Sequence, residues 1–161
     1  MPNFLNVAGN YPLGAYNSEI IPYVSIDLGL APSGDFQLDP IGNLETATGN
    51  QKLIQDIKLF LLSPLGTSLM DSTWGNQVIS MIGTSESRKG QLASAVSQAL
   101  TALIAFKNIE KTRRPLEASE LIDSILNVEI IPESETDNTV SIIITVATHQ
   151  NNQFVVKIPL G

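Results

Sequence analysis

The chain has 161 residues, no cysteine and a net charge of −7; 43% of its residues are hydrophobic and 16% are charged. This length suits one domain with a sizeable core, and the absence of cysteine excludes disulfides and thiolate metal sites. The acidic balance argues against nucleic acid as a partner, and the basic residues, gathered mainly at Arg88-Lys89 and Lys107–Arg114, are not interleaved with aromatic rings.

The low share of charged residues also bears on the surface. Soluble proteins carry about 25% charged residues, so a lower share suggests that other subunits cover part of this chain. No apolar run approaches the length of a membrane span, and the first residues, Met-Pro-Asn-Phe-Leu-Asn, lack the basic segment of a signal peptide. We therefore expect neither membrane insertion nor signal-directed export.

The N-terminal residues predict an irregular arm, which we place at residues 1–30, before an α+β domain at 31–161. Residues 1–22 are rich in Asn, Gly, Pro and Tyr and show no sustained period. The segment Tyr23–Leu28 alternates weakly, and this pattern fits either a strand or an apolar linker.

A hairpin and a helix are expected next. Phe36 and Leu38 precede the turn residues 39–43, and Leu44 follows them; Pro and Gly in a short connection of this kind favour a hairpin. Thr48 stands three residues before Gln51, which predicts a capping box at a helix start. One helical face is apolar, formed by Leu53, Ile54, Ile57, Phe60 and Leu61, and Ser63-Pro64 should end the helix.

The sequence predicts two more helices. A short helix is predicted at Gln77–Ile82, closed by Gly83, and a long one from Arg88 to Asn108. The long helix has an apolar stripe made of Leu92, Val96, Ala99, Leu100, Leu103 and Phe106. The charged segment Glu110–Glu120 is broken by Pro115, which favours a loop or a short helical insertion.

Three strands close the chain, around residues 125–130, 140–146 and 154–158, with polar turns between them. The Ile-rich middle strand should be central in the sheet. The fold class expected is α+β, a helical layer packed on an antiparallel sheet, with an N-terminal arm and a hairpin.

The residues offer little for catalysis. A glycosidase needs two carboxylates across a cleft, and Asp71 near Trp74 is the most lysozyme-like pairing, with Glu45 a further candidate. The structural interpretation, which we favour, is that Asp71 caps or ends a helix and that Trp74 fills the core. His149 is the single histidine and is predicted in a turn, so neither a metal site nor a cofactor site is expected, and we predict no enzymatic activity.

The order of motifs from Asp35 to Gly83 resembles the small baseplate wedge proteins of contractile phage tails, a family often called lysozyme-like. The matching residues are Asp35-Phe36, Leu38-Asp39, Gly42, Gln51, Gln55, Leu61-Leu62, Gly66, Trp74-Gly75, Ile79 and Ile82-Gly83. The resemblance implies a structural virion component, assembled in the host cytoplasm. It also implies about six copies around the tail hub, which join other wedge proteins and the hub and tube proteins and initiate the tail sheath.

The resemblance also implies contact residues. Strand exchange with the sheath would use the arm and the last strand, and the tentative partner-binding residues are Tyr23, Val24, Ile26, Leu28, Arg113, Arg114, Glu120, Phe154, Val156 and Ile158. Many members carry Glu-Pro-Arg-Ile before the first C-terminal strand; here Glu120-Leu121-Ile122 stands nearest, without proline or arginine. Arg113-Arg114 could replace that contact or lie in a solvated loop, and the arm could equally fold back on its own domain.

Three alternative functions of the protein remain. The first is a cell-wall glycoside hydrolase, which predicts activity that is lost when Asp71 or Glu45 is replaced by Ala. The second is the same structural part in a contractile injection machine that is not a phage, and the third is a generic α+β binding module from another assembly.

Overall fold

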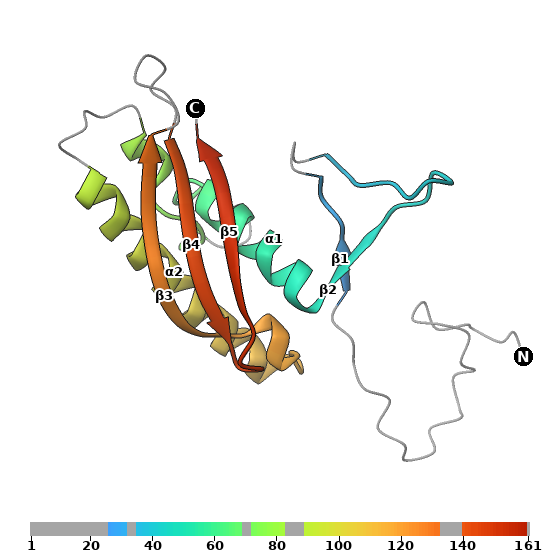
Figure 1. Ribbon diagram of the computed structural model, residues 1–161. Coiled ribbons are helices and arrows are strands. Elements are labelled where there is room, and N and C mark those ends of the chain that lie inside the picture. The colour runs from blue at the N-terminus through green and yellow to red at the C-terminus, as the bar shows by residue number, and fades with distance from the viewer. Residues whose placement is uncertain (1–25, 32–34, 69–71, 83–88, 133–139, 161) are drawn as a thin grey trace, which may run out of the picture.

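The computed structural model describes residues 26–31, 35–68, 72–82, 89–132 and 140–160. Two helices lie on one face of a three-stranded antiparallel sheet, and a separate two-stranded sheet extends to one side (Figure 1). The predicted α+β class, a helical layer on an antiparallel sheet with a hairpin, is confirmed. Of the predicted arm at residues 1–30, residues 1–25 lie outside the described residues, and Ile26–Leu28 forms strand β1.

Helix α1 spans Gly49–Leu62 and uses the apolar face that the sequence predicts. Leu53, Ile57, Phe60 and Leu61 are fully buried. Thr48 is the N-cap residue but its side chain makes no capping hydrogen bond, so the predicted capping box is wrong. The helix ends as predicted, because Ser63 before Pro64 takes an extended conformation.

Helix α2 spans Lys89–Arg113 and is longer than the predicted range. Its stripe of Leu92, Val96, Leu100 and Leu103 is buried against α1 and the sheet. The segment Glu110–Glu120, predicted as a loop or a short helical insertion, is helical up to Arg113 as part of α2 and again in a short 3-10 helix, η3, at Ala118–Glu120. By length and composition α2 could cross a membrane, but here it lies over the sheet as a core helix.

The sheet has the strand order β3-β4-β5, formed by Ile122–Pro132, Val140–Thr148 and Gln153–Leu160. The middle strand is central, as predicted. Ile142, Ile144 and Val146 on β4 are buried toward the helices, and they pair with Ile130, Val128 and Ile125 on β3 and with Ile158, Val156 and Phe154 on β5. The turn from β4 to β5 holds the exposed His149, as predicted.

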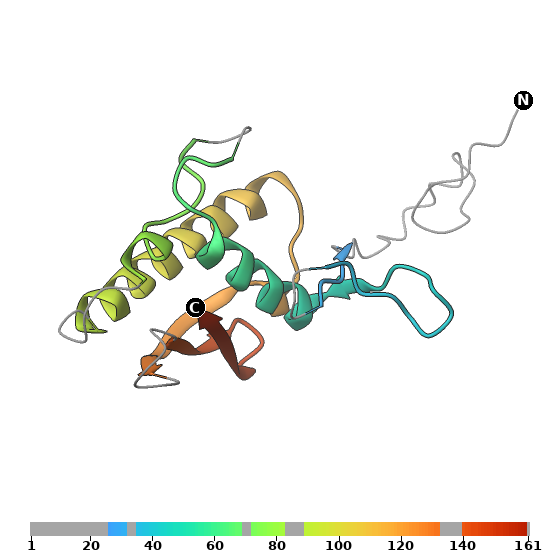
Figure 2. The same ribbon diagram turned by 90° about the horizontal axis from the view of Figure 1, so that it is seen from above.

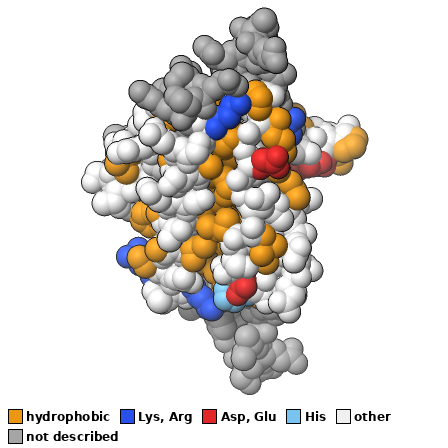
Figure 3. Space-filling view, turned by 60° about the vertical axis from the view of Figure 1, so that its left-hand side comes forward, with side chains coloured by type: hydrophobic (Ala, Val, Ile, Leu, Met, Phe, Trp, Pro, Cys, Tyr) orange, Lys and Arg blue, Asp and Glu red, His pale blue; other side chains and the backbone are white. Residues whose placement is uncertain are grey.

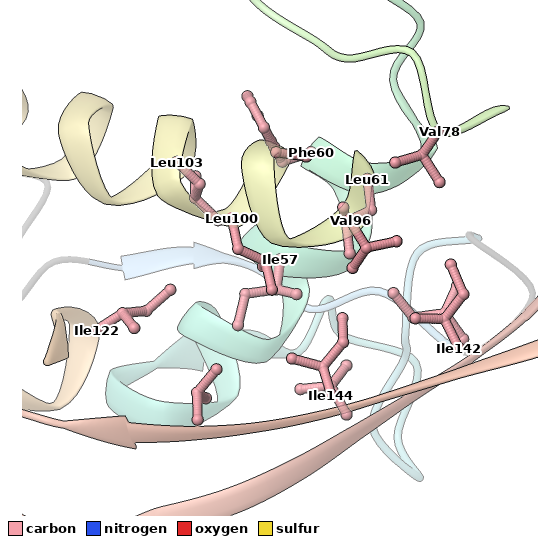
Figure 4. Packing of buried hydrophobic residues seen from close by; sticks show 14 of the residues in the cluster. Ile57, Phe60, Leu61, Val78, Val96, Leu100, Leu103, Ile122, Ile142 and Ile144 are labelled. Carbon is pink, nitrogen blue, oxygen red and sulfur yellow. The ribbon is translucent and has the colours of Figure 1, made fainter. Parts of the chain in front are cut away.

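The core lies between the helices and the sheet (Figure 4). Side chains from α2, α1 and β4 point toward one another, with Leu100 and Leu103 above Ile57 and with Ile142 and Ile144 below. This cluster is dry and continuous, and burial of this kind is the dominant stabilising term in folding.

The connection after α1 is a tight loop that returns to the helix end. Asn76 donates its backbone N–H to the carbonyl of Ser63 at 3.0 Å, and Leu65 donates to Asn76 at 2.9 Å. Gly75 has φ +104°, and a Cβ there would stand 2.4 Å from the carbonyl oxygen of Pro64, so this position requires glycine. A single turn of 3-10 helix, η1, follows at Ile79–Met81 inside the predicted helix range.

The two-stranded sheet pairs β1 (Ile26–Leu28) with β2 (Thr46–Thr48). Isolated bridges Leu30↔Phe36 and Leu38↔Leu44 continue the pairing into the predicted hairpin. We call the described residues 26–31 and 35–48 the hairpin lobe. The lobe extends away from the helices and the sheet, which we call the body (Figure 2).

Candidate docking surface

The hairpin lobe exposes large apolar side chains. Six of them are at least 39% exposed, and Ile41 at the tip reaches 83%. They are Ile26, Leu28, Phe36, Leu38, Ile41 and Leu44. Single exposed apolar residues are ordinary, but a contiguous group of them marks an interaction site in many proteins.

The tip of the lobe is held by Asp39. Its carboxylate accepts hydrogen bonds from the backbone N–H groups of Asn43 at 2.8 Å and Ile41 at 3.0 Å, and from the Asn43 side-chain amide at 3.0 Å. These bonds, the Asn43 backbone bond first, hold the pKa of Asp39 below its ordinary value. Gly42 adopts φ +89° in the same turn. Ile41 is therefore presented on an ordered turn.

A single glutamine joins the lobe to the body. The side-chain oxygen of Gln55 on α1 accepts the N–H of Leu30 at 3.0 Å, and its Nε2 donates to the carbonyl of Leu28 at 2.8 Å. Gln55 thus pairs with the lobe backbone as a neighbouring strand would.

A groove of about 270 Å³ lies beside this junction. Its apolar wall comes from α1 and includes Ile54, Leu59 and Leu62, and its lobe side includes Leu30 and Glu45. Leu59 and Leu62 are 42% and 44% exposed, so the helix side of this groove is an exposed apolar wall.

A second cavity, of about 490 Å³, lies at the other side of α1 and is lined mainly by charged and aromatic residues. Lys107, buried near the end of α2, pairs with Asp56 of α1 and lies 3.6 Å from Glu110. Arg114 pairs with Glu110. Asp27, next to Leu28 of β1, lines the same cavity, so the base of the lobe meets the end of α2 here.

The charged form of Glu110 is favoured in this cavity. Burial would raise the pKa of Glu110, but the hydrogen bond from Arg114 and the charges of Lys107, Arg114 and Lys52 outweigh it and lower the pKa. A general acid in a glycosidase needs the opposite shift. The cavity therefore has the electrostatics of an ion-pair network that joins two helices.

The residues considered for a hydrolase are only partly within the described ranges. Asp71 lies outside the described residues. Trp74 packs edge-on against Phe60 with ring centroids 4.8 Å apart and contacts Phe106 at 5.3 Å, which agrees with its interpretation as a core residue. Glu45 lines the groove by the lobe. Within the described ranges no three metal-ligating side chains form a group.

The predicted contact residues fall in several places. Tyr23 and Val24 lie outside the described residues, whereas Ile26 and Leu28 are exposed on β1, at 56% and 39%. Arg113 ends α2 and, with Arg114, lines the charged cavity.

Three of the predicted contact side chains are buried within this chain. Glu120 is 0% exposed and lies 3.7 Å from the buried Lys52, while Val156 and Ile158 are at most 2% exposed in the core. These three side chains are therefore used inside the chain, and Phe154 is half-buried against the same core; a contact with a partner at these positions stays a prediction. The main chain of β5 lies at an edge of the described sheet.

The apolar residues of the hairpin were not among the contact residues predicted from the sequence. Phe36, Leu38, Ile41 and Leu44 were assigned to a hairpin without a role. The sequence did contain a signal for such a surface. This segment is apolar, and all nine Lys and Arg residues of the chain lie at position 52 or later.

The sheet face turned away from the helices carries a smaller apolar surface. Val155 is 60% exposed and pairs with Thr145, and Ile131, 37% exposed, pairs with Ser141. Seen from the side of β3 and the start of α2, hydrophobic side chains form a band with few charged side chains beside it (Figure 3).

Comparison with known proteins gives one informative likeness. No protein-family profile matches the chain, and no curated protein matches it. Among solved structures, the chain resembles the crystal structure of a provisionally named tail lysozyme from Geobacter sulfurreducens, at 17% identity and a TM-score of 0.50. The match covers 68% of this chain and 86% of that protein. At this identity the likeness shows that the two proteins share a fold.

Proposed function

We propose that this chain is a structural component of a contractile phage-tail baseplate. In this role it joins wedge proteins around the hub and initiates the tail sheath, as the motif order Asp35–Gly83 implies, with about six copies per baseplate and a location in the virion. The observation that carries an assembly role is the hairpin lobe, an ordered apolar projection on a body that buries its own core. The name of the Geobacter sulfurreducens protein supports the tail context.

Two surfaces serve the proposed contacts. The hairpin lobe offers apolar side chains for a wedge or hub protein. The open edge of β5, between Gln153 and Leu160, offers backbone N–H and C=O groups for a strand from the sheath. Because Val156 and Ile158 point into the core, strand addition there would depend on the main chain and on the outward residues Val155 and Lys157.

The experiment that tests this proposal is purification of the tagged chain from cells that produce the particle, with mass spectrometry of the bound proteins. We expect sheath and wedge proteins together. A variant with Phe36→Ser and Ile41→Ser serves as the matched control, since both residues are exposed and their loss leaves the core intact. A monomeric chain that retrieves neither kind of protein would overturn the proposal.

A second candidate, a cell-wall glycoside hydrolase, is favoured by the word lysozyme in the name of the similar structure. The ion pairs made by the carboxylates of Asp56 and Glu110 support the structural role. Incubation of the purified chain with peptidoglycan distinguishes the two. The structural proposal expects no release of fragments from the wild type, whereas a hydrolase would release fragments and lose this activity on replacement of Asp71 or Glu45 by Ala.

A further inference from the structure

The hairpin lobe combines its apolar surface with charge of one sign. It carries Asp27, Asp35, Asp39 and Glu45 and no lysine or arginine. The asymmetry extends over the whole N-terminal part, because residues 1–51 contain five acidic residues, with Glu19 as the fifth, and none of the nine basic ones. The remaining 110 residues hold eleven acidic and nine basic residues, so they are close to balanced.

Two of these carboxylates adjoin exposed apolar side chains along the lobe. Asp35 immediately precedes the exposed Phe36, and Asp39 stands between the exposed Leu38 and the tip residue Ile41. Asp27, between Ile26 and Leu28 on β1, instead lines the charged cavity with Lys107. An apolar centre with a charged rim is the usual anatomy of a protein interface, in which the apolar part supplies affinity and the rim sets partner choice and association rate.

The negative charge around the apolar side chains determines which kind of partner can dock on the lobe. A second copy of the lobe would bring further carboxylates against Asp35 and Asp39, and like charges across an interface cost several kcal/mol. Nucleic acid and anionic lipid headgroups are repelled for the same reason. A protein surface with basic residues around an apolar depression complements both features of the lobe.

We propose that the hairpin lobe docks on a protein surface whose apolar centre is rimmed by lysine and arginine. The proposal rests on the baseplate function and deepens it by naming the chemistry of the partner surface. Ile41, on its ordered turn, enters that surface at the centre, and Phe36, Leu38 and Leu44 widen the contact.

The test places a photo-crosslinking amino acid at position 36 or 41 of the full chain in cells that assemble the particle. Position 155, exposed on the sheet face, is the control. We expect positions 36 and 41 to crosslink to another protein at residues flanked by Lys or Arg. Crosslinks confined to residues 1–25 of the same chain, to a second copy, or to an acidic or uncharged surface would overturn the proposal. It would also fail if position 155 crosslinks and positions 36 and 41 do not.

A charge reversal then tests the rim with the protein identified by crosslinking. Asp35→Lys should weaken binding by about tenfold at low salt, with a smaller loss at high salt. Replacing a Lys or Arg beside the crosslinked residue by Glu should restore binding to the Asp35→Lys chain. Asp39 is left unchanged because its carboxylate holds the turn. Glu129→Lys on β3 is the matched control, and equal affinity of the Asp35→Lys chain and the wild type would refute the charged rim.

The two proposals fail separately. If the protein crosslinked to the lobe has a basic rim but is no tail component, the docking inference stands and the baseplate function falls. If purification retrieves sheath and wedge proteins while lobe crosslinks are absent, the baseplate function stands and the inference falls.

Discussion

In the body, the apolar side chains of α1, α2 and β4 are covered from both sides, whereas in the hairpin lobe comparable side chains face solvent. The lobe keeps its shape by different means: backbone pairing, the Asp39 turn and the two hydrogen bonds to Gln55. Folding free energy and docking surface are therefore carried by different residues. Four substitutions test this difference between the body and the lobe. They are described in order of decreasing expected effect on stability.

The largest effect is expected in the core at Phe60. This side chain is fully buried and contacts both Trp74 and Phe106. Phe60→Ala should lower the free energy of unfolding by about 3–5 kcal/mol, because it removes buried surface and leaves a cavity. Urea unfolding followed by the fluorescence of Trp74 measures this loss. A loss below about 1 kcal/mol would mean that the core relaxes far more than in known cases.

A somewhat smaller effect is expected at the buried ion pair of Glu120 and Lys52. Glu120→Gln leaves the Lys52 ammonium, 3% exposed, with Asp56 at 3.7 Å as its remaining partner. Removal of one member of a buried pair costs about 3 kcal/mol. The double variant Glu120→Gln with Lys52→Met should recover part of the loss in urea unfolding. If the double variant is less stable than Glu120→Gln alone, desolvation of Lys52 is not the cause.

The ion-pair network between α1 and the end of α2 should respond to acid through Glu110. Its folded pKa is lowered from the ordinary value of 4.5, so its stabilising contribution is present above about pH 4.5 and is lost as the pH falls through the folded pKa. The difference in stability between wild type and Glu110→Gln should therefore be below about 1 kcal/mol at neutral pH, since the group is partly exposed, and should shrink toward pH 3. Urea midpoints across this range measure it, with Glu129→Gln as control. A difference that grows in acid would contradict the assignment.

The smallest effect on stability is expected in the lobe. Phe36→Ser removes a side chain that is 59% exposed, and the free energy of unfolding should stay within about 0.5 kcal/mol of the wild type. Incorporation into particles should nevertheless fall, which quantitative mass spectrometry of purified particles measures. A large loss of stability would show that Phe36 supports the fold, and the contrast between lobe and body would not hold.

The body could be predicted in large part from the sequence, because its helices and strands carry regular apolar periods. The stripe of α1 and the central position of β4 follow from such periods. The continuation of α2 to Arg113 could not be predicted, since Lys107 and Glu110 look solvated in the sequence. Lys107 is buried with Asp56 as its partner, which lies 51 residues away and comes close only in the folded chain.

The docking surface was harder to predict for a related reason. Phe36, Leu38 and Leu44 alternate with polar residues as the inward side of a strand does, and periodicity cannot tell whether a second layer covers them. Only the arrangement in space shows that, among the described residues, no element packs over the lobe tip. Glu120 is the converse case, a charged residue in a charged segment that the fold encloses completely.

The bridge made by Gln55 has a consequence for how the surface can change over generations. Its amide contacts only the main-chain groups of Leu28 and Leu30, which every residue type other than proline provides. The lobe can therefore exchange its side chains as its partner changes while its attachment to the helix remains the same. Because this attachment does not depend on which side chains the lobe carries, the exposed surface can adapt rapidly without a change of fold.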